Sequence, residues 1–190
     1  TPIKSSAASD VYKGQILPLK INMKIYLDGP DSGGKTHLAK VLQEALKCEY
    51  IHYSYNEDDF EYADQIKQSF EFLKEHDNVI IDRHLISEYV YGSVVRNEPR
   101  IHFCPDLDGG KDFINDLLNA FDLIIFCLPM DKGIYLKNYV NCMKTKEEYI
   151  SNVDVMSKIY DKYQDIYLTF KSCHPDLQYK VVRYDYLKTL

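Results

Sequence analysis

The residues best suited to chemistry lie between positions 26 and 37, which read YLDGPDSGGKTH. An apolar run breaks there into a glycine-rich loop, and a helix-like run follows. Unpaired N–H groups at a helix N-terminus, joined to a loop that can curl without Cβ clashes, form a cradle for phosphate oxygens. Gly29, Gly34, Lys35 and Thr36 occupy every fixed position of the pattern Gly-x-x-x-x-Gly-Lys-[Ser/Thr]. The spacing therefore predicts a phosphate-binding loop between a strand and a helix.

This loop pattern carries a defined chemistry. Its lysine reaches the β- and γ-phosphates of a nucleoside triphosphate, and its threonine hydroxyl coordinates Mg²⁺. We therefore expect ATP and Mg²⁺ as cofactors, with Lys35 catalytic and Thr36 a metal ligand. The expected nucleotide-binding residues of the loop are Gly29, Asp31, Ser32, Gly33, Gly34, Lys35, Thr36 and His37. The alternative is an ordinary glycine-rich turn in front of a helix.

A second motif, at positions 79–96, reads VIIDRHLISEYVYGSVVR. Asp82 ends an apolar strand, where phosphate-loop proteins keep the acid that helps to hold Mg²⁺. Arg83 follows at once, and its planar guanidinium suits bidentate recognition of phosphate. We predict that Asp82 is a metal ligand and that Arg83 is catalytic and binds a substrate phosphate. The alternative is that the two side chains pair with each other or cap a helix.

Strand-like and helix-like segments alternate from residue 23 to the end of the chain. Continuous β-branched runs are typical of central strands that are buried on both faces. Alternation of this kind predicts an α/β fold with a five-stranded parallel sheet flanked by helices. The expected strands are 24–28, 49–54, 78–82, 122–128 and 179–184. The expected helices are 35–47, 58–76, 84–97, 111–120, 131–141 and 146–171.

Composition bounds the class of protein. With 190 residues and 45% hydrophobic content, the chain can bury one full core. The net charge of −6 argues against a nucleic-acid polymer as partner but permits a small-molecule nucleotide. No apolar run approaches the ~18 residues of a membrane span, so we expect no membrane partner. Five cysteines without CxxC spacing predict reduced thiols in the cytoplasm.

The first 22 residues are small and polar and show no periodicity. We expect 1–22 to be a disordered extension or tag, with a short edge strand at 15–21 as the alternative. Residues 23–190 then form one nucleotide-binding domain.

The second motif also carries a family resemblance. Thymidylate kinases and related nucleotide kinases have Asp-Arg-[Tyr/Phe]-x-x-Ser-x-x-Ala-[Tyr/Phe] after the third strand, and this chain has DRHLISEYVY from Asp82 to Tyr91. From 23 to 190 the chain resembles that family. The resemblance implies a three-layer P-loop kinase fold and ATP-dependent phosphorylation of a deoxynucleoside monophosphate, dTMP first. It also implies a homodimer formed through helices.

The resemblance assigns further roles by position. It implies that Arg83 binds the acceptor phosphate, that Ser87 lies near the base, and that Tyr91 packs where a ribose 2′-hydroxyl would sit. Asp31 matches a family carboxylate near the sugar 3′-hydroxyl. The alternatives are core packing for Tyr91 and a solvated hydroxyl for Ser87. Tyr53 could line a base pocket or could simply pack.

Two departures keep other functions open. The family usually has an arginine after the second strand, and the stretch YIHYSYNEDDFEYADQIK has none. Arg96 or Arg100 could replace it, and Arg96 is nearer because it continues the helix that follows Arg83. The triplet DRH also occurs in herpesvirus-type thymidine kinases, so a deoxynucleoside kinase is an alternative, with Asp31, Glu57 or Asp58 as a base. A nucleotide-binding switch that transfers no phosphate is a third.

A third, basic segment at 132–146 reads KGIYLKNYVNCMKTK. It follows the fourth expected strand, where kinases of this superfamily carry a lid over the transferred phosphoryl group. We expect a lid at about 131–147 and nucleotide contacts from Lys137 and Lys144. The alternative is a basic helix face exposed to solvent.

Overall fold

The structure is a computed structural model that describes residues 22–53, 62–97, 115–144, 152–175 and 179–188. The expected N-terminal extension, apart from its last residue, and its alternative edge strand lie outside these ranges. Glu57, Asp58 and Arg100 lie outside them as well.

A five-stranded sheet forms the centre of the molecule, with strand order β2-β3-β1-β4-β5 and every pairing parallel. The strands are β1 (Lys24–Asp28), β2 (Glu49–His52), β3 (Val79–Asp82), β4 (Leu123–Cys127) and β5 (Val181–Tyr184). This confirms the predicted parallel sheet, and each strand lies within its predicted range. Continuous apolar runs made the central strands β3 and β4 predictable, because these strands are buried on both faces.

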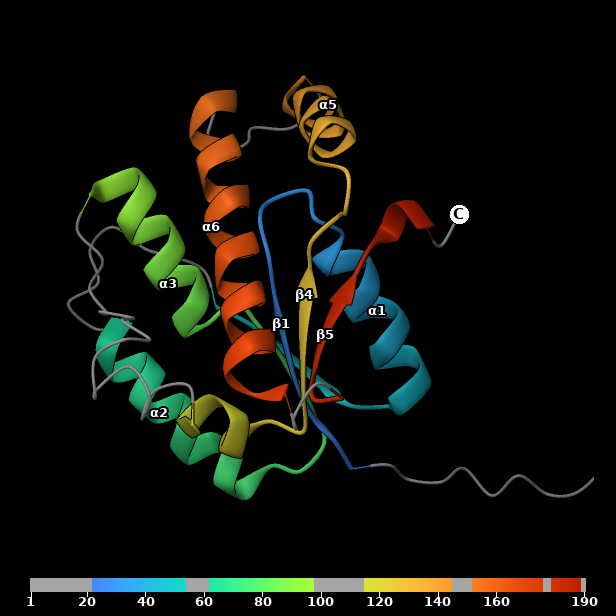
Figure 1. The fold of residues 1–190 in the computed structure, drawn as a ribbon. Helices are drawn as coiled ribbons and strands as arrows, with labels where there is room; N and C mark the ends of the chain where they lie inside the picture. Colours follow the sequence, from blue (N-terminus) through green and yellow to red (C-terminus); the bar gives the residue numbers. More distant parts are fainter. Residues whose placement is uncertain (1–21, 54–61, 98–114, 145–151, 176–178, 189–190) are drawn as a thin grey trace, which may run out of the picture.

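Helices cover both faces of the sheet, as the three-layer prediction requires. They are α1 (Lys35–Leu46), α2 (Tyr62–Glu75), α3 (Leu85–Tyr91), α5 (Lys132–Met143) and α6 (Val153–Cys173). A further helical stretch spans 115–120, and a short 3-10 helix, η3, spans Tyr186–Lys188. In Figure 1, α1 lies on one face, α2, α3 and α6 lie on the other, and α5 lies beyond the carboxyl ends of the strands.

Three helix boundaries differ from the prediction for local reasons. The expected helix 84–97 divides into α3 and a π-helical turn, η1 (Gly92–Arg96). The helix expected from 131 begins one residue later, because the Asp131 side chain accepts a hydrogen bond from the Ile134 N–H (2.8 Å) and caps it. In the same way, Asn152 accepts from the Asp154 N–H (2.9 Å) and starts α6 at Val153.

The strands alternate their side chains between two hydrophobic clusters. Ile25 and Leu27 of β1 pack with Ala39 of α1 on one face. Tyr26 points the other way, into the larger cluster formed with α3 and α6. With both faces covered, the carboxyl ends of the strands form the accessible edge. Among the described helices, none has the length and apolar character that crossing a bilayer would require.

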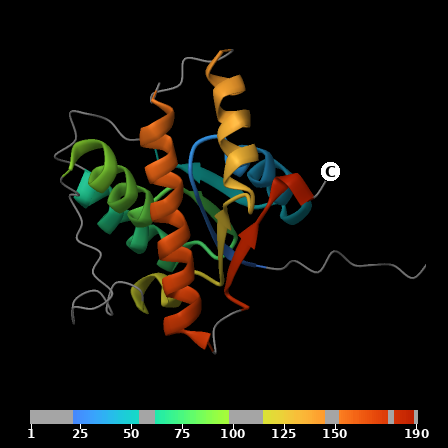
Figure 2. The same ribbon diagram turned by 45° about the horizontal axis from the view of Figure 1, so that its top comes forward.

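The strand order places a crevice at that edge. The chain leaves β1 toward β2 on one side and returns past it, from β3 to β4, on the other. Ligands of open α/β sheets bind at such a reversal point. In the register of β1 with β3, Leu27 lies opposite Asp82, so the loop after β1 and the residues after β3 meet here. Figure 2 brings this edge forward and shows α5 alongside α6 above it.

Candidate functional site

The loop between β1 and α1 is supported from below by the end of β4. Gly29 has φ +144°, and a Cβ there would lie 2.3 Å from the Cys127 carbonyl oxygen. A Cβ at Gly33 would lie 2.5 Å from the same oxygen. Because neither position has room for a side chain, the loop can lie flat on β4 with its N–H groups available to an anion.

Lys35 opens α1 and is almost completely buried. Its Nζ donates to the carbonyl oxygens of Gly29 (2.7 Å) and Pro30 (2.9 Å). Burial lowers the pKa of Lys35 and the Arg83 charge lowers it further, while Asp31 and the other nearby carboxylates act in the opposite direction. The ammonium group is thus held inside the loop, where the predicted role requires it.

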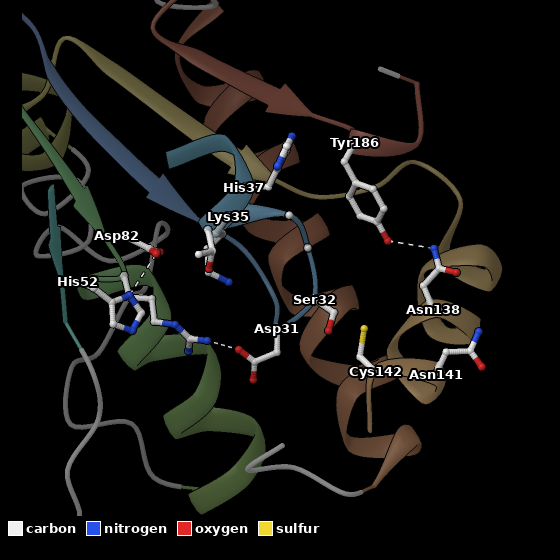
Figure 3. Close-up of a pocket in the computed structure, with 14 residues that line it drawn as sticks. Asp31, Ser32, Lys35, His37, His52, Asp82, Asn138, Asn141, Cys142 and Tyr186 are labelled. Atoms are coloured by element: carbon white, nitrogen blue, oxygen red, sulfur yellow. Dashed lines mark hydrogen bonds and ion pairs between the residues drawn. The ribbon is translucent and has the colours of Figure 1, made fainter. Parts of the chain in front are cut away.

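A pocket of about 640 Å³ lies over this loop at the carboxyl edge of the sheet (Figure 3). It brings together most of the residues predicted from the two motifs: Asp31, Ser32, Gly33, Gly34, Lys35, Thr36, His37, Asp82 and Arg83. The remaining lining residues are His52, Asn138, Asn141, Cys142 and Tyr186.

Asp82 ends β3 and lies buried at the pocket wall. Its Oδ2 accepts a hydrogen bond from Tyr50 Oη (2.7 Å) and lies 3.1 Å from His52 Nδ1. Its Oδ1 is buried and has no hydrogen-bond partner among the described residues. Burial alone would raise the pKa of Asp82, but His52, Lys35 and Tyr50 outweigh it and hold that pKa below its usual value.

These donors fit Mg²⁺. The Asp82 carboxylate and the exposed Thr36 hydroxyl both line the pocket and are hard oxygen ligands. Within the described ranges, three or more His, Cys, Asp or Glu side chains gather nowhere in a metal-binding group. An ion held here would therefore take its other ligands from nucleotide phosphates and water, as Mg²⁺ commonly does.

Arg83 adopts a left-handed backbone conformation, with φ +65°. Its N–H donates to the Leu27 carbonyl oxygen (3.1 Å), and its guanidinium forms an ion pair with Asp31. The guanidinium also lies over the Tyr91 ring, 5.3 Å from the centroid. Its buried Nε has no hydrogen-bond partner among the described residues. Arg83 and Asp82 therefore use different partners and do not pair with each other.

Two phenols hold the middle of the loop at Asp31. Tyr91 Oη accepts from the Asp31 N–H (3.1 Å), and Tyr135 Oη donates to the Asp31 carbonyl oxygen (2.8 Å). Burial would raise the pKa of the Asp31 carboxyl, but the charges of Arg83 and Lys35 hold it below its usual value. Tyr91, the last residue of α3, thus contacts the loop beside the cation of Arg83.

Other predicted residues do not line this pocket. The Ser87 hydroxyl is buried against Asp28 and Tyr163, and Arg96 forms an ion pair with the buried Glu88. Tyr53 packs against the core, and Lys137 and Lys144 are exposed. Gly29 and Tyr91 are also absent from the pocket lining, although both belong to or contact the loop.

The geometry of α5 explains why Lys137 and Lys144 do not line the pocket. On α5, the residues that line the pocket are Asn138, Asn141 and Cys142, which are spaced i, i+3 and i+4 and share one face. Lys137 projects from another face, and Lys144 follows the last residue of α5. In the described residues, α5 therefore presents neutral groups to the pocket.

The histidine of the DRH triplet belongs to the core. His84 is buried, its Nε2 bonds the Ser69 hydroxyl, and its ring packs edge-on against those of Tyr26 and Phe70. Among the described residues that line the pocket, His84 is absent. The DRH triplet by itself therefore does not distinguish a monophosphate acceptor from a nucleoside acceptor.

Several residues in or beside the pocket were not predicted from the sequence. Tyr50 and His52 are two positions apart on β2, and in the sheet register His52 lies opposite Asp82. Period-two alternation along β2 could have suggested that both face Asp82. Tyr186 follows β5, and its Oη accepts from Asn138 Nδ2 (3.1 Å). Nothing local in the sequence marks that long-range pair.

No protein-family model matches this sequence, and no curated protein matches it. Solved structures do resemble the chain. The YorR protein from Bacillus subtilis, in complex with phosphorylated GDP, has a TM-score of 0.57 at 23% identity, with 85% of each chain covered. Thymidylate kinase from Candida albicans has a TM-score of 0.53 at 14% identity, over 86% of this chain and 83% of that chain.

Deoxyadenosine kinase from M. mycoides with bound dATP has a TM-score of 0.51 at 18% identity, over 86% of this chain and 91% of that chain. At such low identity these likenesses concern the fold. The fold of this chain, with its five-stranded parallel sheet and flanking helices, is that of P-loop kinases.

Proposed function

We propose that this protein is a kinase that transfers the γ-phosphoryl group of ATP to a deoxynucleoside monophosphate, with dTMP as the preferred acceptor. One observation carries the proposal. A phosphate-loop lysine, a carboxylate and an arginine converge on a single pocket: Lys35, Asp82 and Arg83. Among the described residues, the buried atoms Asp82 Oδ1 and Arg83 Nε have no hydrogen-bond partner. Those groups match the donor, metal and acceptor functions of phosphoryl transfer.

The donor side is built by the loop and the start of α1. The loop N–H groups and Lys35 would bind the β- and γ-phosphates, exchanging the two carbonyl contacts of Nζ for phosphate oxygens. Thr36 and Asp82 would hold Mg²⁺, which supplies charge neutralisation across the phosphates. Lys35 then stabilises charge on the transferred group from a fixed position, so little reorganisation is needed.

The acceptor side is built around Arg83. Its guanidinium is already oriented by the Asp31 carboxylate and the Tyr91 ring, and its planar fork suits a phosphate. A phosphate acceptor is ionised at neutral pH and needs no strong base. Holding its oxygen in line with the γ-phosphorus is then most of the catalysis.

A coupled assay of ADP formation, with the products separated by ion exchange, tests this function. The screen should include the common ribo- and deoxynucleosides and their monophosphates. We expect dTMP to give the highest kcat/KM and to yield dTDP. ATP-dependent ADP formation with no phosphorylated product from any monophosphate would refute the proposal.

Sugar preference is assigned to Tyr91. Its ring lies between Arg83 and the loop backbone at Asp31, so we propose that it excludes a 2′-hydroxyl from an acceptor held by Arg83. Tyr91→Ala should lower the dUMP-to-UMP ratio of kcat/KM by about tenfold. A wild type that uses both equally well, or an unchanged ratio in Tyr91→Ala, would remove this role.

A deoxynucleoside kinase is the second candidate, and one observation favours it. Arg83 is the one arginine among the described residues that line the pocket, because Arg96 pairs with Glu88. An acceptor phosphate would then be held by a single guanidinium. One guanidinium is enough to hold the 5′-hydroxyl of a nucleoside acceptor. Thymidine outperforming dTMP in the same screen would select this function, with Asp31 as the nearest carboxylate. Tight retention of nucleotide without turnover would instead indicate a switch.

A further inference from the structure

The carboxylate of Asp28 lies fully buried at the end of β1, directly before the phosphate loop. It does not line the pocket, and no step of the proposed transfer uses it. Burying a carboxylate is costly unless its oxygens are satisfied. The structure must therefore gain something from placing one here.

Its two oxygens accept hydrogen bonds from four residues. Oδ1 accepts from the Gly29 N–H (2.7 Å), Ser87 Oγ (2.6 Å) and Tyr163 Oη (2.7 Å). Oδ2 accepts from the Ser87 N–H (3.0 Å) and from Tyr26 Oη. A carboxylate offers about four lone-pair sites, so this one is saturated. Burial raises the pKa of Asp28, and the donors and the Lys35 charge oppose that rise.

Apart from Tyr26 of β1, the donors come from three different parts of the molecule. Gly29 begins the phosphate loop, Ser87 lies in the first turn of α3 just after Arg83, and Tyr163 lies in the middle of α6. Ser87 Oγ and Tyr163 Oη also lie 3.0 Å apart, which closes the triangle around Asp28. All three side chains in this triangle are buried, so water does not replace these bonds readily.

We propose that Asp28 is a positioning residue that fixes the phosphate loop relative to the start of α3, with Tyr163 as its clamp on α6. Each oxygen bonds α3, and Oδ1 bonds the loop and α6 as well. Sliding α3 away from the loop would therefore break charge-assisted hydrogen bonds, which are the stronger kind.

The consequence for catalysis rests on the proposed function. The loop holds the donor phosphates, and Arg83, four residues before Ser87, would hold the acceptor. An error of about 1 Å between such groups can cost about 10²-fold in rate. Asp28 would therefore affect kcat by holding the loop and the start of α3 in place, without touching either substrate.

The mechanical part can be tested without any activity. Tyr163→Phe removes one hydroxyl from the triangle, and Tyr160→Phe is the matched control. Tyr160 lies one turn earlier on α6 and is also buried, but its hydroxyl donates to the Pro129 carbonyl oxygen. Hydrogen exchange should be followed by mass spectrometry in peptides covering 24–36 and 83–91.

We expect Tyr163→Phe to speed amide exchange in both peptides by about tenfold, since one charge-assisted bond is lost. Tyr160→Phe should leave both peptides within about twofold of wild type. Unchanged exchange in Tyr163→Phe, or equal changes in the two variants, would overturn the positioning role. This result does not depend on which acceptor is phosphorylated, or on whether any is.

The kinetic part separates positioning from general stability. At a temperature well below both melting points, Tyr163→Phe should lower kcat per folded molecule by about tenfold while the Kd for ATP stays within about twofold. Tyr160→Phe should change neither, even if its Tm falls as far. Equal kcat in the two variants would reduce Asp28 to a structural residue. If the wild type transferred no phosphate but Tyr163→Phe still sped amide exchange in both peptides, the proposed function would be refuted and the positioning role would stand.

Discussion

The two walls of the pocket face the same phosphate loop but are built differently. The wall formed by the ends of β1 and β3 and by the start of α1 contains the charged residues Lys35, Asp82 and Arg83. Lys35 and Asp82 are buried, and Arg83 forms an ion pair with Asp31. The opposite wall presents neutral side chains from α5 and the segment after β5: Asn138, Asn141, Cys142 and Tyr186. The difference indicates that stabilisation of the transferring group is concentrated on the sheet side, while α5 contributes shape and hydrogen bonds.

The largest effect should come from the lysine at the centre of the charged wall. Lys35→Ala should lower kcat by about 10²–10⁴, because it removes charge stabilisation where the phosphoryl group moves. Steady-state kinetics at saturating ATP measure this loss. Lys40→Ala is the control, since Lys40 is exposed on the same helix and should have no effect. A Lys35→Ala protein with wild-type kcat would contradict the kinase function.

Arg83 should show the next largest effect, and on one substrate only. Arg83→Lys keeps the charge but loses the fork, so KM for dTMP should rise by about 10–100-fold while KM for ATP stays within about twofold. Arg96→Lys is the matched variant, because Arg96 pairs with Glu88. An equal rise in KM for dTMP in Arg96→Lys would bring that arginine back into the acceptor site.

The Asp31–Arg83 pair should contribute to stability in a pH-dependent way. Its carboxyl has a folded-state pKa below the unfolded value, so its stabilisation is present above about pH 4 and is lost as pH falls through the lowered folded pKa. In urea unfolding, Asp31→Asn should cost about 1–3 kcal/mol between pH 6 and 8, and the gap should shrink below pH 4.

The matched control is the exposed pair of Lys132 with Asp161. Asp161→Asn should cost well under about 1 kcal/mol at any pH, because solvent screens the pair. If Asp31→Asn cost as little stability as Asp161→Asn, the Asp31–Arg83 ion pair would stabilise the protein no more than an exposed pair does.

The smallest effects should come from the neutral wall. Lys137→Ala and Lys144→Ala should each change kcat by less than about threefold, because both lysines are exposed and away from the pocket. Asn138→Ala should raise KM for ATP by about two- to fivefold, through loss of its bond to Tyr186. Steady-state kinetics with ATP varied would show this. A tenfold fall in kcat in either lysine variant would mean that α5 brings charge to the transferring group.

The parts of the molecule that were predicted correctly depend on neighbours in sequence. The central strands β3 and β4 are largely continuous apolar runs, and the phosphate loop is one short motif, so local pattern is sufficient for them. The parallel sheet also explains why the loop lies beside Asp82 and Arg83, because parallel strands carry their carboxyl ends to one edge.

The parts that were not predicted depend on distant partners. The Ser87 hydroxyl could have faced solvent or a substrate, and its engagement with Asp28 joins residues 59 positions apart. The sequence shows that the segment is basic, but the side chains that face the pocket depend on the rotation of α5 about its axis. That rotation is set by Tyr135 and Tyr139, which are buried in the core. Neither relation leaves a local signal in the sequence.

The close approach of Cys127 to the loop has a consequence for reading homologues. Gly29 belongs to the phosphate-loop pattern, but position 33 is one that the pattern leaves free. Here the Cys127 carbonyl excludes a side chain from Gly33 as firmly as from Gly29. A deep mutational scan should therefore find position 33 as intolerant as the motif itself. An invariant glycine at this position of an alignment would reflect its contact with β4. It would be mistaken for a residue that contacts the ligand.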